Sequence, residues 1–176
     1  MSTLHVENLK GLSSGSNANK IIVPSGQTLH APGHVIQHAT TLSAVNNGNY
    51  TSTSLTHITT FDTSFTPKFA NSIIRLSWNG MVDVQTSSAP NPWFSFSFFQ
   101  DSTDLQSSGL TYNGTGYNQF IGSNGGTKYI NMVDEFSAGS TSARTYKIYV
   151  RVGASTHVAY LSTPTRRRMI VEEIAQ

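Results

Sequence analysis

The sequence predicts an all-β fold, a jelly-roll β-sandwich with a short extended N-terminal arm or stalk. Three observations predict it: the composition, the alternation of apolar and polar residues, and the spacing of turns. The 176 residues include 24 Ser, 21 Thr and 14 Gly, and only 11% are charged. Thr favours strands, whereas Ser and Gly favour turns. About eight strands with turns at roughly even spacing are typical of a sandwich or jelly roll.

The clearest strand runs from Ile73 to Val84, where alternate residues from Ile74 onward are apolar or Gly and most of those between them are polar. Period-two alternation of this length indicates a strand with one buried face. After a Ser- and Pro-rich turn, Phe94, Phe96 and Phe98 alternate with serines. We expect these two strands to form a hairpin and to carry much of the core.

The remaining strands are predicted from shorter patterns at 35–45, 51–61, 130–136, 145–152, 158–161 and 169–174. The chain then divides into three parts. Residues 1–20 are expected to be an attachment peptide and flexible linker, 21–35 a short β stalk, and 36–176 the head domain. Leu4, Val6 and Leu9 are the candidate docking residues of the arm. An arm of this length cannot bury enough surface to fold alone, so it must pack on a partner, on copies of itself or on the head.

The net charge and the distribution of apolar residues argue against nucleic-acid binding, export and membrane insertion. The formal net charge is only +2, which argues against non-specific nucleic-acid binding, since that needs many phosphate contacts. The polar N-terminus does not resemble a signal peptide, and no apolar run is long enough to span a membrane. The chain has no Cys, so neither disulfides nor thiolate chemistry are expected. We expect a protein made in the cytoplasm without membrane insertion.

No motif predicts an enzyme or a cofactor. Adjacent carboxylates such as Asp134-Glu135 and Glu172-Glu173 point to opposite faces of a strand, whereas a glycosidase needs two carboxyl groups across a cleft. His30, His34 and His38 are spaced four apart, but Pro32 and Gly33 make a helix that would unite them improbable. We therefore expect no bound metal, with a three-His site on an oligomer axis as the weaker alternative.

The run Arg166-Arg167-Arg168 is the densest cluster of charge. Arg binds phosphate and acidic glycans through bidentate contacts. Side chains alternate between faces in a strand, however, so the three do not form one patch. The favoured interpretation is a solvated start of a strand, or an ion pair with a glutamate of the same or a neighbouring chain.

The Tyr-rich stretch from Tyr112 to Tyr129 is the best candidate for recognition. Aromatic rings interleaved with Asn, Ser and Gly are typical of binding loops, because they combine contact area with adaptable hydrogen bonding. The alternative is an ordinary exposed loop or one buried against a neighbouring subunit. The candidate receptor-binding residues are Tyr112, Asn113, Tyr117, Asn118 and Tyr129.

The last strand is apolar on both faces, with Met169 and Val171 on one and Ile170 and Ile174 on the other. A strand of a sandwich needs only one buried face. We therefore expect these four residues to lie at an interface between copies of the chain.

Several short sequence segments in the body resemble segments of known proteins. They are Gly33-His34-Val35-Ile36-Gln37, Phe65-Thr66-Pro67-Lys68, Ile73-Ile74-Arg75-Leu76, Thr145-Tyr146-Lys147-Ile148 and the closing Met169-Ile170-Val171-Glu172-Glu173-Ile174-Ala175-Gln176. With the stalk-like Lys20-Ile21-Ile22-Val23-Pro24-Ser25-Gly26, they resemble the C-terminal jelly-roll heads of fibre and appendage proteins from tailed phages of marine bacteria, which are similar to the C1q/TNF type.

The resemblance implies a homotrimer in the virion that attaches to a glycan or protein of the host surface and joins other virion proteins through its arm. The chain departs from long fibres because only residues 1–20 precede the stalk, where such fibres carry extended shafts. Two alternatives remain open: a capsid decoration or collar protein with a purely structural role, and a non-viral C1q/TNF-like ligand or lectin.

Overall fold

The computed structural model describes residues 13–16, 23–25, 27–29, 31–43, 48–86, 93–105, 117–120, 126–161 and 167–176, of which Thr86 and 117–120 by their backbone only. The described chain is built of antiparallel strands and one short 3₁₀ turn, η1 (Thr59–Phe61). The strands are β1 (Val35–Ser43), β2 (Asn49–Tyr50), β3 (Thr56–His57), β4 (Thr63–Phe65), β5 (Ile73–Thr86), β6 (Trp93–Gln100), β7 (Thr103–Asp104), β8 (Tyr117–Phe120), β9 (Gly126–Ser137), β10 (Arg144–Val152), β11 (His157–Tyr160) and β12 (Arg167–Ile174).

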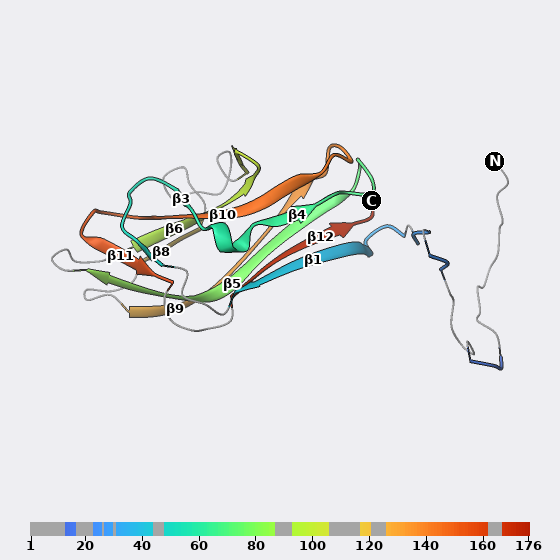
Figure 1. Ribbon diagram of the computed structural model, residues 1–176, viewed down its shortest axis with the longest axis horizontal. Helices are drawn as coiled ribbons and strands as arrows, with labels where there is room; N and C mark the ends of the chain where they lie inside the picture. The colour runs from blue at the N-terminus through green and yellow to red at the C-terminus, as the bar shows by residue number, and fades with distance from the viewer. Residues whose placement is uncertain are drawn as a thin grey trace.

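The strands form two sheets that pack face to face (Figure 1). In the first, here called sheet A, β5 pairs with β12 and β11 on one side and with β9 on the other, while β1 extends the sheet beyond β12 and β2 beyond β11. In sheet B, β10 lies between β6 and the short strands β3 and β4, and β6 also pairs with β7 and β8. The predicted all-β sandwich of jelly-roll character is confirmed.

The alternation predicted for β5 is confirmed, because Ile74, Leu76 and Trp78 are fully buried. The predicted hairpin of β5 and β6 is wrong: β5 belongs to sheet A and β6 to sheet B. The chain therefore passes from sheet A to sheet B between β5 and β6, and the apolar faces of these two strands meet across the layers. The rings of Trp78 and Phe96 accordingly lie with centroids 4.7 Å apart.

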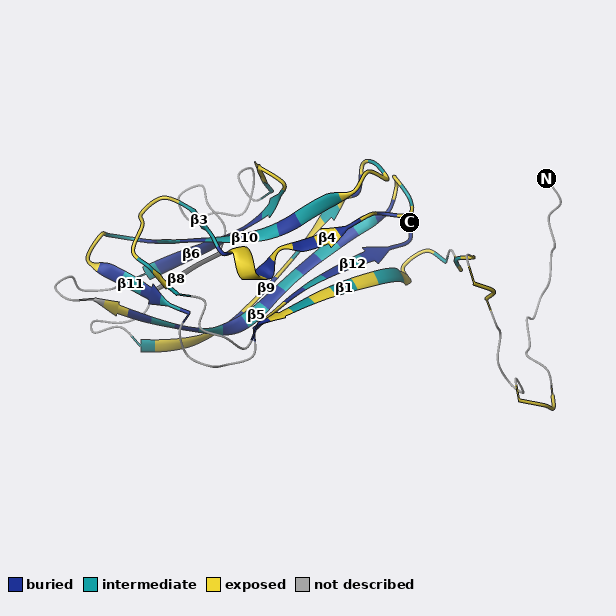
Figure 2. Ribbon diagram, viewed as in Figure 1, coloured by how far each residue is buried: buried dark blue, intermediate teal, exposed yellow. Residues whose placement is uncertain are grey.

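The core fills the space between the two sheets (Figure 2). β6 contributes the fully buried Phe94, Phe96 and Phe98. Phe61 of η1 packs edge-on against Trp78, with 5.9 Å between the ring centroids. The continuous strand expected over 51–61 is wrong, since only β3 and η1 form there. The turn η1 instead directs Phe61 into the core, where an aromatic side chain of this size buries a large apolar area.

The arm leaves the head beside the residues that follow β12. Gly33 donates its backbone N–H to Ala175 O (2.8 Å), and Ala175 N–H donates to His34 O (2.9 Å). The described arm residues before Val35 form turns and extended segments rather than a strand within this chain. One turn is closed by the bond from Gln27 N to Pro24 O (3.1 Å). Leu4, Val6 and Leu9 lie outside the described residues. Within the described part, no helix has the length and apolar character needed to cross a membrane.

Candidate interaction surfaces

The outer face of sheet A is a four-stranded surface whose side chains are aligned in rows across β1, β12, β5 and β9. The strand registers place Thr40, Ile170, Ser77 and Val133 side by side in one row. The next row holds Leu42, Arg168, Asn79 and Asn131, and the row on the other side holds His38, Glu172, Arg75 and Glu135. Alternation along each strand turns all of these side chains away from the core.

Three large apolar side chains stand out from this face. Tyr129 is 82% exposed, Leu42 65% and Val133 55%. Met81 faces Tyr129 in the register of β5 and β9, and Ile170 is half-buried between its neighbours. Exposed apolar side chains that share one surface are typical of a region that contacts another molecule.

Charged residues at one end of the same face are paired within the chain. Arg75 Nε lies 2.7 Å from Glu135 Oε1, and Arg75 Nη1 lies 3.7 Å from Glu172 Oε2. The three side chains are partly exposed, so this network contributes little to the stability of the fold. It gives this end of the face a charged margin, whereas the exposed apolar side chains lie on the two outer strands, β1 and β9.

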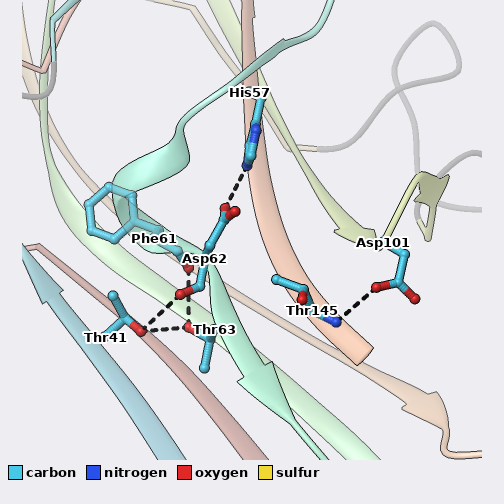
Figure 3. Close-up of polar contacts among 7 residues, drawn as sticks. All are labelled: Thr41, His57, Phe61, Asp62, Thr63, Asp101 and Thr145. Carbon is cyan, nitrogen blue, oxygen red and sulfur yellow. Dashed lines mark hydrogen bonds and ion pairs between the residues drawn. The ribbon is translucent and has the colours of Figure 1, made fainter. Parts of the chain in front are cut away.

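The two edges of the sandwich differ. At the β1 edge, side chains join sheet A to sheet B: Thr41 Oγ1 lies 2.8 Å from Thr63 Oγ1, and Thr63 Oγ1 donates to Phe61 O at 3.1 Å (Figure 3). Nearby, His57 Nε2 lies 2.5 Å from Asp62 Oδ1. β1 and β4 therefore cover one another. β9, at the other edge of sheet A, pairs with β5 and with no second strand among the described residues.

The outer face of sheet B carries a ladder of stacked rings. His57 and Tyr149 stack with 4.9 Å between their centroids, and Phe99 stacks on the other side of Tyr149 at 3.9 Å. Farther along the sheet, the guanidinium of Arg151 lies over the ring of Trp93. Because His57 and Phe99 occupy both faces of Tyr149, this ring cannot stack on a sugar, and the ladder is best explained as support for β3, β10 and β6.

Asp101 begins the loop that joins β6 to β7. Its positive φ of 54° is the conformation that a two-residue hairpin loop requires, and Asp tolerates it better than most residues. The backbone N–H of Asp101 donates to Thr145 O (2.8 Å). Asp101 Oδ1 also accepts from Thr145 N (2.9 Å), as Figure 3 shows. Asp101 thus acts as a structural residue, fastening this hairpin to β10.

The predicted recognition residues fall on different sheets. Tyr112 and Asn113 lie outside the described residues. Tyr117 and Asn118 lie in β8, opposite Phe96 and Ser95 of sheet B. Tyr129 lies in β9 of sheet A. The interpretation of 112–129 as one loop is therefore wrong at both β8 and the start of β9. The backbone places Tyr129 in a different sheet from Tyr117 and Asn118, and a recognition role for these residues stays a prediction.

The predicted interface residues of β12 also separate. Met169 and Val171 are fully buried in the core of the same chain, so they offer no surface to a second copy. Ile174 is only 6% exposed. Ile170 is the member of the four that lies half-exposed on the outer face of sheet A. Three of these four apolar residues are thus buried within the head of the same chain. An interface at Ile170 stays a prediction.

Two buried charges in β12 were missed by reasoning from the sequence. Arg167, expected at a solvated strand start, is fully buried, and burial lowers the pKa of its guanidinium. Its Nε donates to Met81 O at 2.9 Å. The stem of Arg167 crosses Gly80, where an added Cβ would lie 2.6 Å from Arg167 Cγ. The signal in the sequence was Gly80, which interrupts the otherwise bulky inward face of β5.

Glu173 is the second buried charge and is fully buried in the chain. Its carboxylate accepts hydrogen bonds from Lys68 N (2.9 Å to Oε2), Phe69 N (2.9 Å), Ser72 Oγ (2.7 Å) and Gln37 Nε2 (2.6 Å). Burial raises the pKa of Glu173, but these hydrogen bonds outweigh it and lower the pKa from its ordinary value. The carboxylate thereby fastens β1 and the segment between β4 and β5 to β12.

The structure brings no metal cluster together among the residues it describes. His34 and His38 are described and His30 is not. Comparison with known proteins assigns no relative: no family model matches the chain, and no curated protein matches it.

Proposed function

We propose that the chain is a structural protein of a bacteriophage virion, a trimeric fibre- or spike-type appendage whose jelly-roll head serves attachment to the host surface. The observation that carries this proposal is that the two ends of the head differ in how they are connected. The arm before β1 and the residues after β12 leave from one end, so the opposite end is free to face outward (Figure 1).

Three contacts fasten the arm to that end of the head. Two are the backbone bonds between Gly33–His34 and Ala175. In the third, Lys68 Nζ donates to Thr28 Oγ1 at 3.1 Å. Lys68 belongs to the segment that Glu173 holds in place. The arm is therefore joined to a region with a buried polar anchor, as a mounting element requires.

The strand registers define the opposite end. At the mounting end, Val35 and Ile73 each lie opposite Ile174. Ser137 lies opposite Ile73 on the other side of β5. At the other end, Val84 lies opposite Gly126 and Thr86 opposite His157. The turn from Gly153 to Thr156 lies there too, just before β11. Loops at the free end of a rigid sandwich are well placed to recognise a surface.

The proposals of a virion location and of a trimer rest on the resemblance of short sequence segments to those of phage appendage heads. The outer face of sheet A supports self-association, because Leu42 and Ile170 lie on it beside polar residues. In this proposal, the arm docks on other virion proteins and the host provides a surface glycan or protein. The purely structural alternative, a decoration or collar protein, uses the same mounting end but needs no contact at the free end.

The test compares the full chain with a chain lacking residues 1–20. The proposal expects both to fold and to form the same oligomer, while only the full chain joins virions. The isolated head should then compete with virions for host cells. A truncated chain that still joins virions contradicts docking through the arm. A full chain that joins virions, with an isolated head that never competes for host cells, supports the structural role instead.

A matched control for the competition assay alters the free end of the head. Ser155→Arg and Thr156→Arg enlarge the turn before β11, whose two side chains are exposed. Attachment through the free end predicts weaker competition by this double variant. Equal competition by the double variant and the unaltered head contradicts a role for this turn. The double variant Thr141→Arg with Ala143→Arg, at two exposed positions of the mounting end, is the control expected to change nothing.

A further inference from the structure

The edge of β9 is long and carries exposed apolar side chains. β9 pairs with β5 over residues 126–137, and no other strand among the described residues pairs with its second edge. Tyr129 and Val133 project from this edge strand and are mostly exposed. The backbone groups along an open strand edge form a template for another strand, and folded proteins usually protect such an edge.

The sequence of β9 is complementary to itself when it is reversed about Asn131. An antiparallel copy placed with Asn131 opposite Asn131 puts Lys128 opposite Asp134 and Tyr129 opposite Val133. Ile130 then faces Met132, and Thr127 faces Glu135. Residues directly opposite one another lie on the same face of the sheet, so apolar meets apolar and the base meets an acid.

We propose that two copies of the chain pair through their β9 edges, antiparallel and with Asn131 on the two-fold axis, to join two A sheets into one continuous sheet. A two-fold contact requires the same patch on both copies to be self-complementary, and the strand has this property about Asn131. The partner at this edge is a second copy of the chain, because β9 itself supplies both residues of each complementary pair.

Neighbouring registers lack this complementarity. Moving the axis to Met132 places Ile130 opposite Asp134 and Lys128 opposite Phe136. Moving it to Ile130 places Lys128 opposite Met132. Each shift sets a charge against an apolar side chain. A lysine at an edge normally discourages pairing, so Lys128 favours the one register in which it meets Asp134.

This contact goes beyond the proposed function and does not depend on it. Val133 and Ile170 are separated by Ser77 of β5 in the same row, so the β9 edge is distinct from the centre of the outer face. In a trimeric appendage, the edge contact joins heads of two different trimers. In a chain that forms no trimer, it gives a dimer.

A cysteine at the axis tests the register. The chain contains no Cys, so any disulfide must come from the introduced residue. In Asn131→Cys, the two thiols face each other across the pair, at a Cα separation of about 4.5–5.5 Å that suits a disulfide. Oxidised glutathione is the oxidant: it is reduced as the two thiols lose their protons and join.

The expected result is a covalent dimer of Asn131→Cys on a non-reducing gel at micromolar protein, with at least tenfold less dimer for the control Thr127→Cys. Thr127 lies on the same face of the same strand, but the proposed register sets it opposite Glu135. Equal cross-linking of both variants, or none by a folded Asn131→Cys protein, overturns the proposal. Circular dichroism establishes that each variant is folded.

A charge exchange tests the same contact without oxidation. Lys128→Asp and Asp134→Lys each create two repulsive pairs and should weaken the association by about tenfold. The double variant restores opposite charges and should recover the affinity in sedimentation equilibrium. Failure of the double variant to recover, with both single variants folded, contradicts the register. Both experiments leave residues 1–20 unaltered and use no virions, so their outcomes are separate from the test of the proposed function.

Discussion

The buried carboxylate of Glu173 lies 2.9 Å from the backbone nitrogen of Lys68, in a segment 105 residues earlier in the chain. Its hydrogen-bond partners are backbone N–H groups, a hydroxyl and an amide. A buried charge is tolerated when it is fully hydrogen-bonded. The contact joins β12 to the segment on which the arm is mounted, so Glu173 is central to the stability of that end.

Replacing Glu173 with Gln tests this anchor. The amide keeps the shape but turns one acceptor oxygen into a donor that faces the donors of the loop, so we expect the free energy of unfolding to fall by about 2–4 kcal/mol. Urea unfolding measures it. Glu172→Gln, one residue earlier and partly exposed, is the matched control and should change stability by less than about 1 kcal/mol. Equal effects of the two substitutions would show that Glu173 is not an anchor.

The same carboxylate predicts a dependence on pH. The folded-state pKa of Glu173 is lowered from the ordinary value of 4.5. Its contribution to stability is therefore complete above the pKa of the unfolded state and is lost as the pH falls through the lower pKa of the folded state. We expect the stability difference between the unaltered chain and Glu173→Gln to be constant from pH 7 to about 5 and to shrink below it. A difference that grows on acidification contradicts the assignment.

Gly80 is required by the stem of Arg167. In Gly80→Ala, the added Cβ would lie 2.6 Å from Arg167 Cγ, so Arg167 must move and weaken its bond to Met81 O. We expect a loss of about 1–3 kcal/mol, as for overpacking of a core. Thermal unfolding measures it, with Ser77→Ala on the outer face of β5 as the control. Unchanged stability of Gly80→Ala would mean that Arg167 has room to shift.

His157 offers a substitution in the opposite direction. It is 3% exposed, and neither ring nitrogen has a hydrogen-bond partner among the described residues. A buried polar group without a partner costs stability, so His157→Leu should be neutral or raise the free energy of unfolding by about 1 kcal/mol. His38→Leu on the exposed face of β1 provides the control in urea unfolding. A marked loss for His157→Leu alone would show that the imidazole makes a contact the chain needs.

Period-two alternation identified the strands with one apolar face, and β5 and β10 follow it closely. Alternation says which side chains share a face, but not which sheet a strand joins, so β6 was assigned to the wrong partner. It also does not show how a charge on an apolar face is satisfied. Arg167 and Glu173 share the inward face of β12 with Met169 and Val171, yet their partners Met81 and Lys68 lie far away in the sequence.

The candidate surfaces were predictable only in part. Tyr129 was identified because it is an aromatic residue among polar ones, although a loop was expected and a strand is found. Leu42 and Val133 were not identified, because one exposed apolar residue in a strand resembles a buried one until the register is known. The rows across sheet A depend on pairings between strands that are distant in sequence, and these pairings require the three-dimensional structure.

The central claim is that the chain is a self-assembling head, and the mass of the purified full chain in light scattering tests it most directly. The chain mass is 19.1 kDa. We predict an assembly of three chains, or of six where the β9 edges also pair. A clean monomer at micromolar concentration would contradict the account, and a dimer abolished by the single charge exchanges would leave the β9 contact standing without the trimer.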